Sequence, residues 1–362
     1  MSAQKYNCFL RCRAIVMLGG VMMCSAAGAV DLNIYGVGHA SYDSIDSGPS
    51  TSDYLHSNSS RLGLKGDEDL GDGLSVYFQY ESGVDLTGNG FGDGNGGNGT
   101  GGQIFTRARD SFLGLKSDQY GSIQFGRVGG LNQWLYDYNL FADQVGDLGN
   151  IWGGDGLPGR LNNTIEYLSP TFNGFSADVT YAPSQGMSNQ NSVIFKANYA
   201  SGALKLGGAY AKFGNSMAGT PDYKAYALTG SYDFGQFNLG GGYQRETDIG
   251  GTPGADRDKF TVGGAVKVGV NGTLKAQYAW AGKLSGTPNS AAHQMVVGYD
   301  YNLGKSAMVY LAYARTSNQR NTAYSAYDYG HGNEGTPAIL DGMSPSVVSV
   351  GLVYKFDVGL LK

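Results

Sequence analysis

Much of the chain follows a two-residue alternation of apolar and polar positions. Val76, Phe78 and Tyr80, for example, are separated by single residues, Tyr77 and Gln79. The same alternation occurs in four further stretches, residues 258–268, 291–301, 307–315 and 346–356. Because successive side chains of a strand point to opposite faces, this pattern predicts β-strands with one apolar and one polar face.

The connections between these strands alternate between short and long. Seven short turns rich in Gly, Asp and Asn lie near residues 67–73, 117–121, 170–174, 201–202, 234–236, 269–272 and 302–305. Eight longer polar stretches are centred near residues 46, 94, 146, 186, 215, 250, 286 and 330. The pattern predicts an all-β chain, a 16-stranded antiparallel transmembrane β-barrel with short turns at one end. A soluble β-sandwich is the alternative, but it would not explain the alternating connection lengths.

Closure of this sheet is expected from the cost of an unpaired backbone group in hydrocarbon, which is several kcal/mol. We therefore expect the first strand, near residues 32–42, to pair with the last, near residues 347–356. Many of the 26 tyrosines fall in or at the ends of the predicted strands. Tyrosine rings favour the headgroup level of a membrane, where the hydroxyl reaches water.

The first 29 residues have the layout of a secretory signal. Lys5, Arg11 and Arg13 precede the apolar residues 14–23, and small residues follow at residues 27–29. This predicts cleavage near Ala29 and a mature barrel domain of residues 30–362. All three cysteines lie in the signal, so the mature chain has no disulfide and no thiolate ligand for a metal.

Charge and motifs exclude several functional classes. The mature chain has 22 basic and 30 acidic residues, a balance that disfavours a nucleic-acid partner. The four histidines, His39, His56, His293 and His331, are dispersed, and no H-E-x-x-H or G-x-S-x-G motif is present. We therefore predict no enzyme activity, no cofactor and no metal site.

Two hairpin-like stretches carry a more specific signal. One is SRLGLKGDEDLGDGL at residues 60–74; the other is RDSFLGLK at residues 109–116, followed by YGSIQFGR at residues 120–127. Both resemble strand hairpins of the general diffusion porins of Gram-negative bacteria, and LNIYG at residues 32–36 resembles the first strand of that family. The resemblance implies a homotrimeric outer-membrane barrel that contacts lipid and lipopolysaccharide and passes small hydrophilic solutes.

The resemblance also implies a constriction made by a third loop folded into the barrel, here about residues 129–160. The residues that match its wall arginines and acidic groups are Arg61, Arg109, Arg160, Glu81, Asp147 and Asp155. Alternation supports Arg61 independently, because it points away from the face of Leu62 and Leu64. A charge on the lipid face near the midplane would cost about 2–4 kcal/mol.

Two features leave alternatives open. Porins of this family usually end at an aromatic residue, which Phe356 matches, but residues 357–362 follow it. Either these residues form a periplasmic tail, or the assembly signal is read internally or less efficiently. The functional alternatives are a substrate-selective channel for an anion, amino acid or sugar and a non-conducting barrel adhesin that displays residues 317–344.

Overall fold

The computed structural model describes residues 30–361 except 89–104, 131–135, 188–189 and 215–218. The predicted signal, residues 1–29, lies outside the described residues. The described strands are β1 (Asp31–Asp46), β2 (Thr51–Ser57), β3 (Arg61–Gly71), β4 (Leu74–Val84), β5 (Phe105–Ser117), β6 (Gly121–Gly129), β7 (Arg160–Leu168), β8 (Phe175–Ala182), β9 (Ser192–Ser201), β10 (Leu204–Phe213), β11 (Tyr223–Asp233), β12 (Phe237–Thr247), β13 (Arg257–Val268), β14 (Gly272–Ala281), β15 (Ala292–Asn302), β16 (Ala307–Asn318) and β17 (Ser346–Leu361). Within the described ranges, three short helical turns, η1 (Tyr136–Tyr138), α2 (Gly149–Trp152) and η2 (Ile249–Gly251), lie between strands.

These segments form a closed barrel of 16 antiparallel strands, as predicted. Strands β2 and β3 count as one, because both pair with β1: residues 51–57 with its second half and residues 61–67 with its first half. A break at residues 58–60, where Ser59 has a φ of 45°, separates them. The first connection at the long-loop end, expected to be long, is only residues 47–50, because β1 and β2 extend beyond the membrane-length segment.

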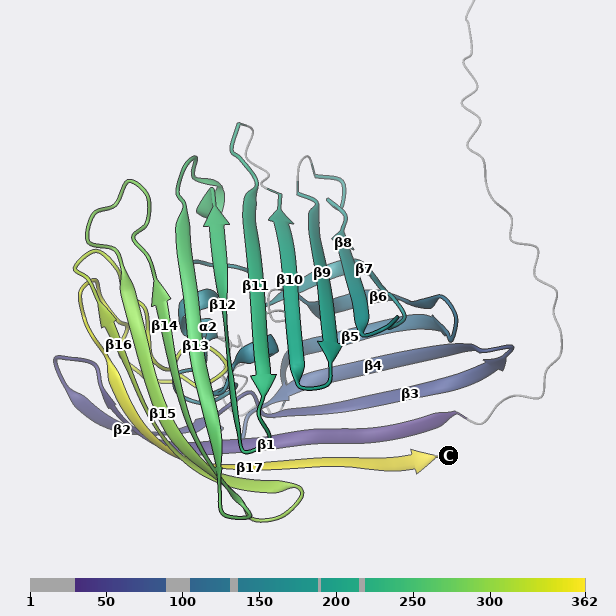
Figure 1. Ribbon diagram of the computed structural model, residues 1–362, viewed down its shortest axis with the longest axis horizontal. Helices are drawn as coiled ribbons and strands as arrows, with labels where there is room; N and C mark the ends of the chain where they lie inside the picture. Colours follow the sequence, from purple (N-terminus) through teal and green to yellow (C-terminus); the bar gives the residue numbers. More distant parts are fainter. Residues whose placement is uncertain (1–29, 89–104, 131–135, 188–189, 215–218, 362) are drawn as a thin grey trace, which may run out of the picture.

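The barrel closes where β1 and β17 lie side by side (Figure 1). Their antiparallel register runs from Leu32 opposite Leu361 to Asp46 opposite Ser346. Of the two alternatives left open for the residues after Phe356, a tail separate from the barrel does not describe residues 357–361. Residues 357–361 continue β17 and pair with the first residues of β1. Without them, the backbone N–H and C=O groups at the start of β1 would have no partner on that side.

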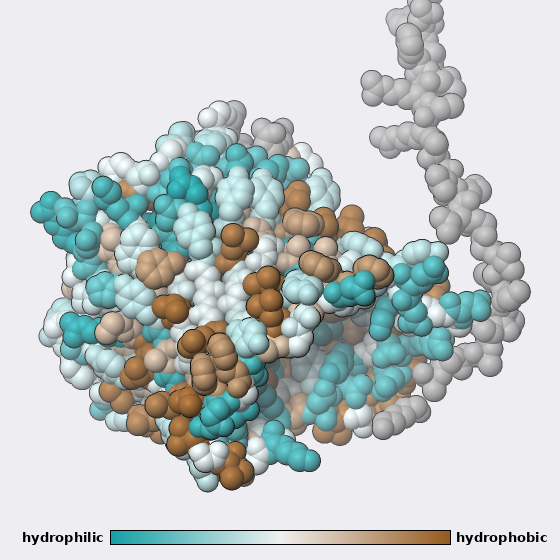
Figure 2. Space-filling view, viewed as in Figure 1, coloured by the Kyte–Doolittle hydropathy of each residue, from teal (hydrophilic) through white to brown (hydrophobic). Residues whose placement is uncertain are grey.

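The outer wall of the barrel is apolar, and its strand ends are aromatic. Leu228, Val350 and Leu352 are half exposed or more, and Figure 2 shows apolar residues spread over the strand wall and hydrophilic ones toward the loops. Stacked rings of Phe234 and Phe237, 4.5 Å apart, mark the short-turn end. In the described part of the chain, no helix has the length and apolar character needed to cross a membrane.

Removing residues 357–362 tests the role of the extended β17. The truncated barrel should lose its folded, fast-migrating gel band at a temperature lower by roughly 5 °C or more, because several strand hydrogen bonds worth about 1 kcal/mol each disappear. The control is Asp357→Asn, which removes only the exposed ion pair with Lys65, worth at most about 1 kcal/mol. Unchanged thermal stability of the truncated chain would contradict this role.

Candidate pore constriction

The segment between β6 and β7, residues 130–159 and here called loop 3, folds into the barrel. Five of its apolar side chains are fully enclosed: Phe141, Val145, Leu148, Ile151 and Trp152 are at most 1% exposed. They pack against the inner faces of the strands from β9 to β16, and α2 lies behind β12 and β13 in Figure 1. Loop 3 therefore fills one side of the lumen.

Very small residues recur along the wall that receives loop 3. Buried alanines face it from alternate positions of three strands, Ala225 and Ala227 in β11, Ala279 and Ala281 in β14, and Ala312 and Ala314 in β16. Glycines complete the fit, because a Cβ on Gly242 would approach the Trp152 ring to 2.8 Å and one on Gly298 would approach Phe141 to 2.7 Å. Close packing of the loop depends on these missing side chains.

Charged side chains of the wall hold loop 3 at its edge. Lys259 of β13 lies 2.8 Å from a carboxylate oxygen of Asp155 and 2.6 Å from one of Glu246. Arg257 lies 3.0 Å from the other oxygen of Asp155. Burial alone would raise the pKa of Asp155, but the adjacent cations hold that pKa below its usual range. Asp155 thus connects loop 3 to the wall formed by β13.

Asp147 lies entirely inside loop 3. Its two oxygens accept hydrogen bonds from the Asn139 side-chain amide (2.8 Å) and from the backbone N–H groups of Asp143 (2.8 Å) and Gly149 (2.7 Å). Burial, together with the nearby Asp143 carboxylate, raises the pKa of Asp147 to about 7. The side chain stabilises the backbone of the loop and is 0% exposed.

The predicted arginines gather on the opposite wall. Glu81 of β4 lies 2.6 Å from Nε of Arg109 and 3.9 Å from Nε of Arg61, and it accepts a 3.0 Å hydrogen bond from Tyr35. Arg61 also reaches loop 3, where its Nη1 lies 3.3 Å from Asp143. The loop carboxylate nearest the arginines is therefore that of Asp143.

Strand bulges aim these side chains into the lumen. The pairing of β4 with β5 shifts between Tyr80 and Ser82, so that two residues, Arg109 and Asp110, lie opposite Glu81. Both then line the same cleft, and Asp110 lies 2.7 Å from Nε of Arg160. A bulge inserts one extra residue and redirects its neighbours. Simple alternation along β5 would place only one of the two residues inside.

The cleft between loop 3 and the arginine wall has a volume of about 640 Å³. Its charged lining comprises Arg61, Arg109, Arg160, Lys196, Lys355, Asp110, Asp143, Glu166 and Asp178. The structure thus brings together the three predicted arginines and Glu81, whereas Asp147 lies within loop 3 and Asp155 at its far edge. The sequence analysis did not identify Asp110, Asp143 and Lys196 as residues of the cleft. It also overlooked the alternating alanines of β11, β14 and β16, a local pattern that could have indicated which strands pack against loop 3.

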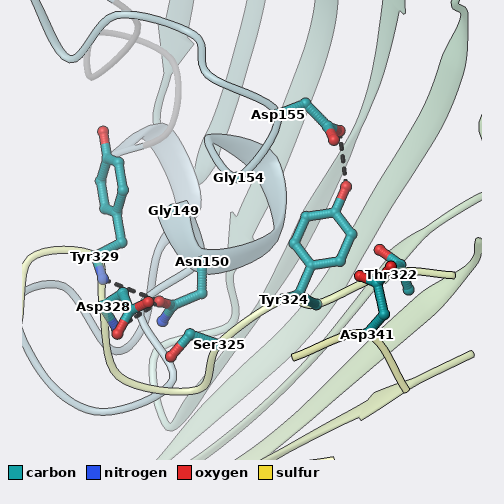
Figure 3. A pocket seen from close by; sticks show the side chains of 11 residues that line it. Gly149, Asn150, Gly154, Asp155, Thr322, Tyr324, Ser325, Asp328, Tyr329 and Asp341 are labelled. Atoms are coloured by element: carbon teal, nitrogen blue, oxygen red, sulfur yellow. Dashed lines mark hydrogen bonds between the residues drawn. The ribbon is translucent and has the colours of Figure 1, made fainter. Parts of the chain in front are cut away.

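A second connection also folds inward. Residues 319–345, here called loop 8, cover loop 3 and leave a cavity of about 500 Å³ between the two loops. Figure 3 shows Tyr324 directed at Asp155, to which it donates a 2.7 Å hydrogen bond. The Asn150 side-chain oxygen accepts from the backbone N–H groups of Asp328 and Tyr329 at 3.0 and 2.9 Å. Loop 8 is therefore tied to loop 3 and not free above the barrel.

Comparisons with known proteins agree with this geometry. A family model described as Gram-negative porin matches residues 14–321. Outer membrane porin protein 32 of Delftia acidovorans is 31% identical over 95% of this chain and 98% of that protein. The major outer membrane protein P.IB of Neisseria gonorrhoeae is 28% identical over 78% of this chain and 88% of that protein.

Solved porin structures superpose on most of the barrel. The anion-selective porin from Comamonas acidovorans matches with a TM-score of 0.75 and 25% identity, over 90% of this chain and all of that one. The trimer form of OmpT from Vibrio cholerae matches with a TM-score of 0.66 and 19% identity, over 91% of this chain and all of that one. The chain belongs to the Gram-negative porin family and forms an outer-membrane channel for passive diffusion of small hydrophilic solutes.

Proposed function

We propose that solutes cross the barrel through the cleft between loop 3 and the wall of β3 to β9. The observation that supports this proposal is the 3.3 Å contact of Arg61 with Asp143, because it marks the point where the wall and loop 3 approach each other beside the cleft that both residues line. In this proposal Arg61, Arg109, Arg160 and Glu81 act at the constriction. Asp147 and Asp155 act indirectly, by fixing the loop that faces them.

Opposed charges across a narrow aqueous gap produce a field across the direction of transport. Such a field orients water and dipolar solutes and disfavours apolar ones, which must disturb the ordered water. Among the described residues, five basic and four acidic ones line the cleft, and Glu81 lies beside the arginines. Because the charges nearly balance, we infer general diffusion of small hydrophilic solutes with a modest ion preference.

A substrate-selective anion channel is the second candidate. Its support is the basic group of Arg61, Arg109, Arg160 and Lys196 on one wall, together with the structural similarity to a porin that is described as anion-selective, that from Comamonas acidovorans. Carboxylates within 2.6–2.7 Å of Arg109, Arg160 and Lys196 reduce the field of these cations. Conductance that saturates with one anion would favour this candidate over general diffusion.

We also propose that the channel is a homotrimer, that its outer wall contacts lipid and lipopolysaccharide, and that residues 1–29 are removed before assembly. The apolar wall supports the lipid contact, and the solved trimer form of a similar fold supports the oligomer.

Because the similar proteins are porins, we propose that the chain has no catalytic role. A non-conducting adhesin is the alternative, which stepwise conductance in planar bilayers would exclude.

Neutralising Arg61 tests the position of the constriction. Arg61→Gln removes a partly exposed cation, so we expect the permeability to cations to rise and that to anions to fall, each by up to about fivefold, since a unit charge at about 4 Å in water is worth about 1 kcal/mol. The readout is the reversal potential across a salt gradient. The matched control is Arg109→Gln with Glu81→Gln, which removes a 2.6 Å ion pair without changing the net charge and should shift the ratio less. An unchanged reversal potential for Arg61→Gln would remove that side chain from the solute path.

Releasing the edge of loop 3 tests whether its anchoring sets the channel size. Lys259→Met leaves Asp155 and Glu246 without their shared buried cation, a change that typically costs about 3–5 kcal/mol. We expect larger and noisier single-channel conductance from a barrel that still shows its folded gel band. The control is Arg245→Met, which breaks exposed ion pairs on neighbouring β12 and should leave conductance unchanged. Wild-type conductance in a folded Lys259→Met channel would contradict the proposal.

A further inference from the structure

Three side chains that are far apart in the sequence meet at the long-loop end of the barrel. Asp43 comes from β1, His56 from the paired strand β2, and His331 from loop 8; all three are fully buried. One carboxylate oxygen of Asp43, Oδ2, lies 2.7 Å from Nδ1 of His56 and 3.3 Å from Nε2 of His331. The three potential ligand atoms all lie within 4.8 Å of one another.

The outer nitrogens of both histidines face oxygen acceptors. Nδ1 of His331 lies 2.6 Å from the carbonyl oxygen of Gly332, which can only accept, so this nitrogen carries the proton. Nε2 of His56 lies 3.4 Å from the carbonyl oxygen of Glu334 and 3.9 Å from its carboxylate. Nδ1 of His56 donates a 2.7 Å hydrogen bond to Asp43, and Nε2 of His331 lies 3.2 Å from the Ser41 hydroxyl. A metal ion bound between the three side chains would take the place of these contacts and accept the lone pairs of both nitrogens. Metal-binding histidines show this arrangement, with the second ring nitrogen donating to a carbonyl or carboxylate.

Two buried carboxylates in the cluster also favour a bound cation. The carboxylates of Asp43 and Glu334 are 0% and 4% exposed, and neither Glu334 oxygen has a hydrogen-bond partner among the described residues. Buried carboxylates are costly unless they are paired or bind a metal. A divalent cation bound between Asp43 and the two histidines would offset this buried negative charge.

We propose that Asp43, His56 and His331 bind a divalent transition-metal ion of the Zn²⁺ class, with Glu334 orienting His56 from behind. Two imidazole nitrogens and a carboxylate suit Zn²⁺ and disfavour Mg²⁺ and Ca²⁺, which prefer oxygen ligands. Tetrahedral Zn²⁺ with bonds of about 2.0–2.1 Å requires ligand atoms about 3.3 Å apart. The Asp43–His331 distance already matches, and the Asp43–His56 distance needs to open by roughly 0.6 Å.

A metal ion at this site would join loop 8 to the barrel wall. Asp43 and His56 belong to the barrel wall, whereas His331 belongs to loop 8. A metal ion shared by the three fixes loop 8 in its inward position over loop 3. The histidines are dispersed along the chain, so the sequence by itself predicts no metal site. Strand pairing and the inward fold of loop 8 bring His56 and His331 to a ring-centroid distance of 5.3 Å.

Equilibrium dialysis of the folded channel, stripped with EDTA, against micromolar Zn²⁺ tests the proposal. We expect one Zn²⁺ per chain, undiminished by a large excess of Mg²⁺ or Ca²⁺. His331→Gln, which changes a loop residue and leaves the strands intact, should weaken binding by tenfold or more. The matched control is His293→Gln, an exposed position on β15, which should bind Zn²⁺ like the wild type.

Cobalt provides a readout that does not depend on any variant. Co²⁺ in the wild-type site should give the intense visible bands of tetrahedral coordination, and Zn²⁺ should displace it. The proposal is overturned by wild-type protein that retains no Zn²⁺, by an absence of these bands, or by wild-type affinity in folded His331→Gln. Loss of Zn²⁺ in His293→Gln as large as in His331→Gln would also overturn it, because binding would then not depend on the cluster.

Discussion

The structure depends on the pairing of backbone groups across the junction between β1 and β17. A strand edge in hydrocarbon would leave N–H and C=O groups without water or partner, at a cost of several kcal/mol each. Closure removes both edges, and the extension of β17 through Leu361 continues this pairing to the start of β1. Once the sheet is closed, alternation divides the side chains of every strand between lipid and lumen.

The inner face is then divided between packing and transport. On the side of β10 to β16, alanines and glycines make room for loop 3, and Lys259 and Lys275 bind its acidic or carbonyl oxygens. On the side of β3 to β9, arginines and acidic residues project into the remaining cleft. Small residues that admit loop 3 on one wall, and charged residues that line the open cleft on the other, therefore decide where the aqueous path lies.

Part of this arrangement could be predicted from the sequence. Strand number and closure follow from a period of two and from connection lengths, which are local properties. The orientation of Arg61 could be predicted from alternation. The orientation of Arg109 and Asp110 toward the same cleft could not, because it depends on a bulge that alternation does not show. Asp143 and Asp147 differ by only four positions, and the tertiary fold of loop 3 alone decides that Asp143 meets Arg61 while Asp147 binds the loop backbone. The inward fold of loop 8 is likewise set by long-range contacts.

Chemical accessibility tests most directly the claim that water fills only the arginine side of the lumen. Beyond residue 29 the sequence has no cysteine, so single cysteines can be introduced at Arg61, in the cleft, and at Ala227, which is 3% exposed beneath loop 3. We predict that a charged methanethiosulfonate reagent modifies Arg61→Cys and lowers its single-channel conductance, while Ala227→Cys remains unmodified. Equal modification and block at both positions would contradict the claim.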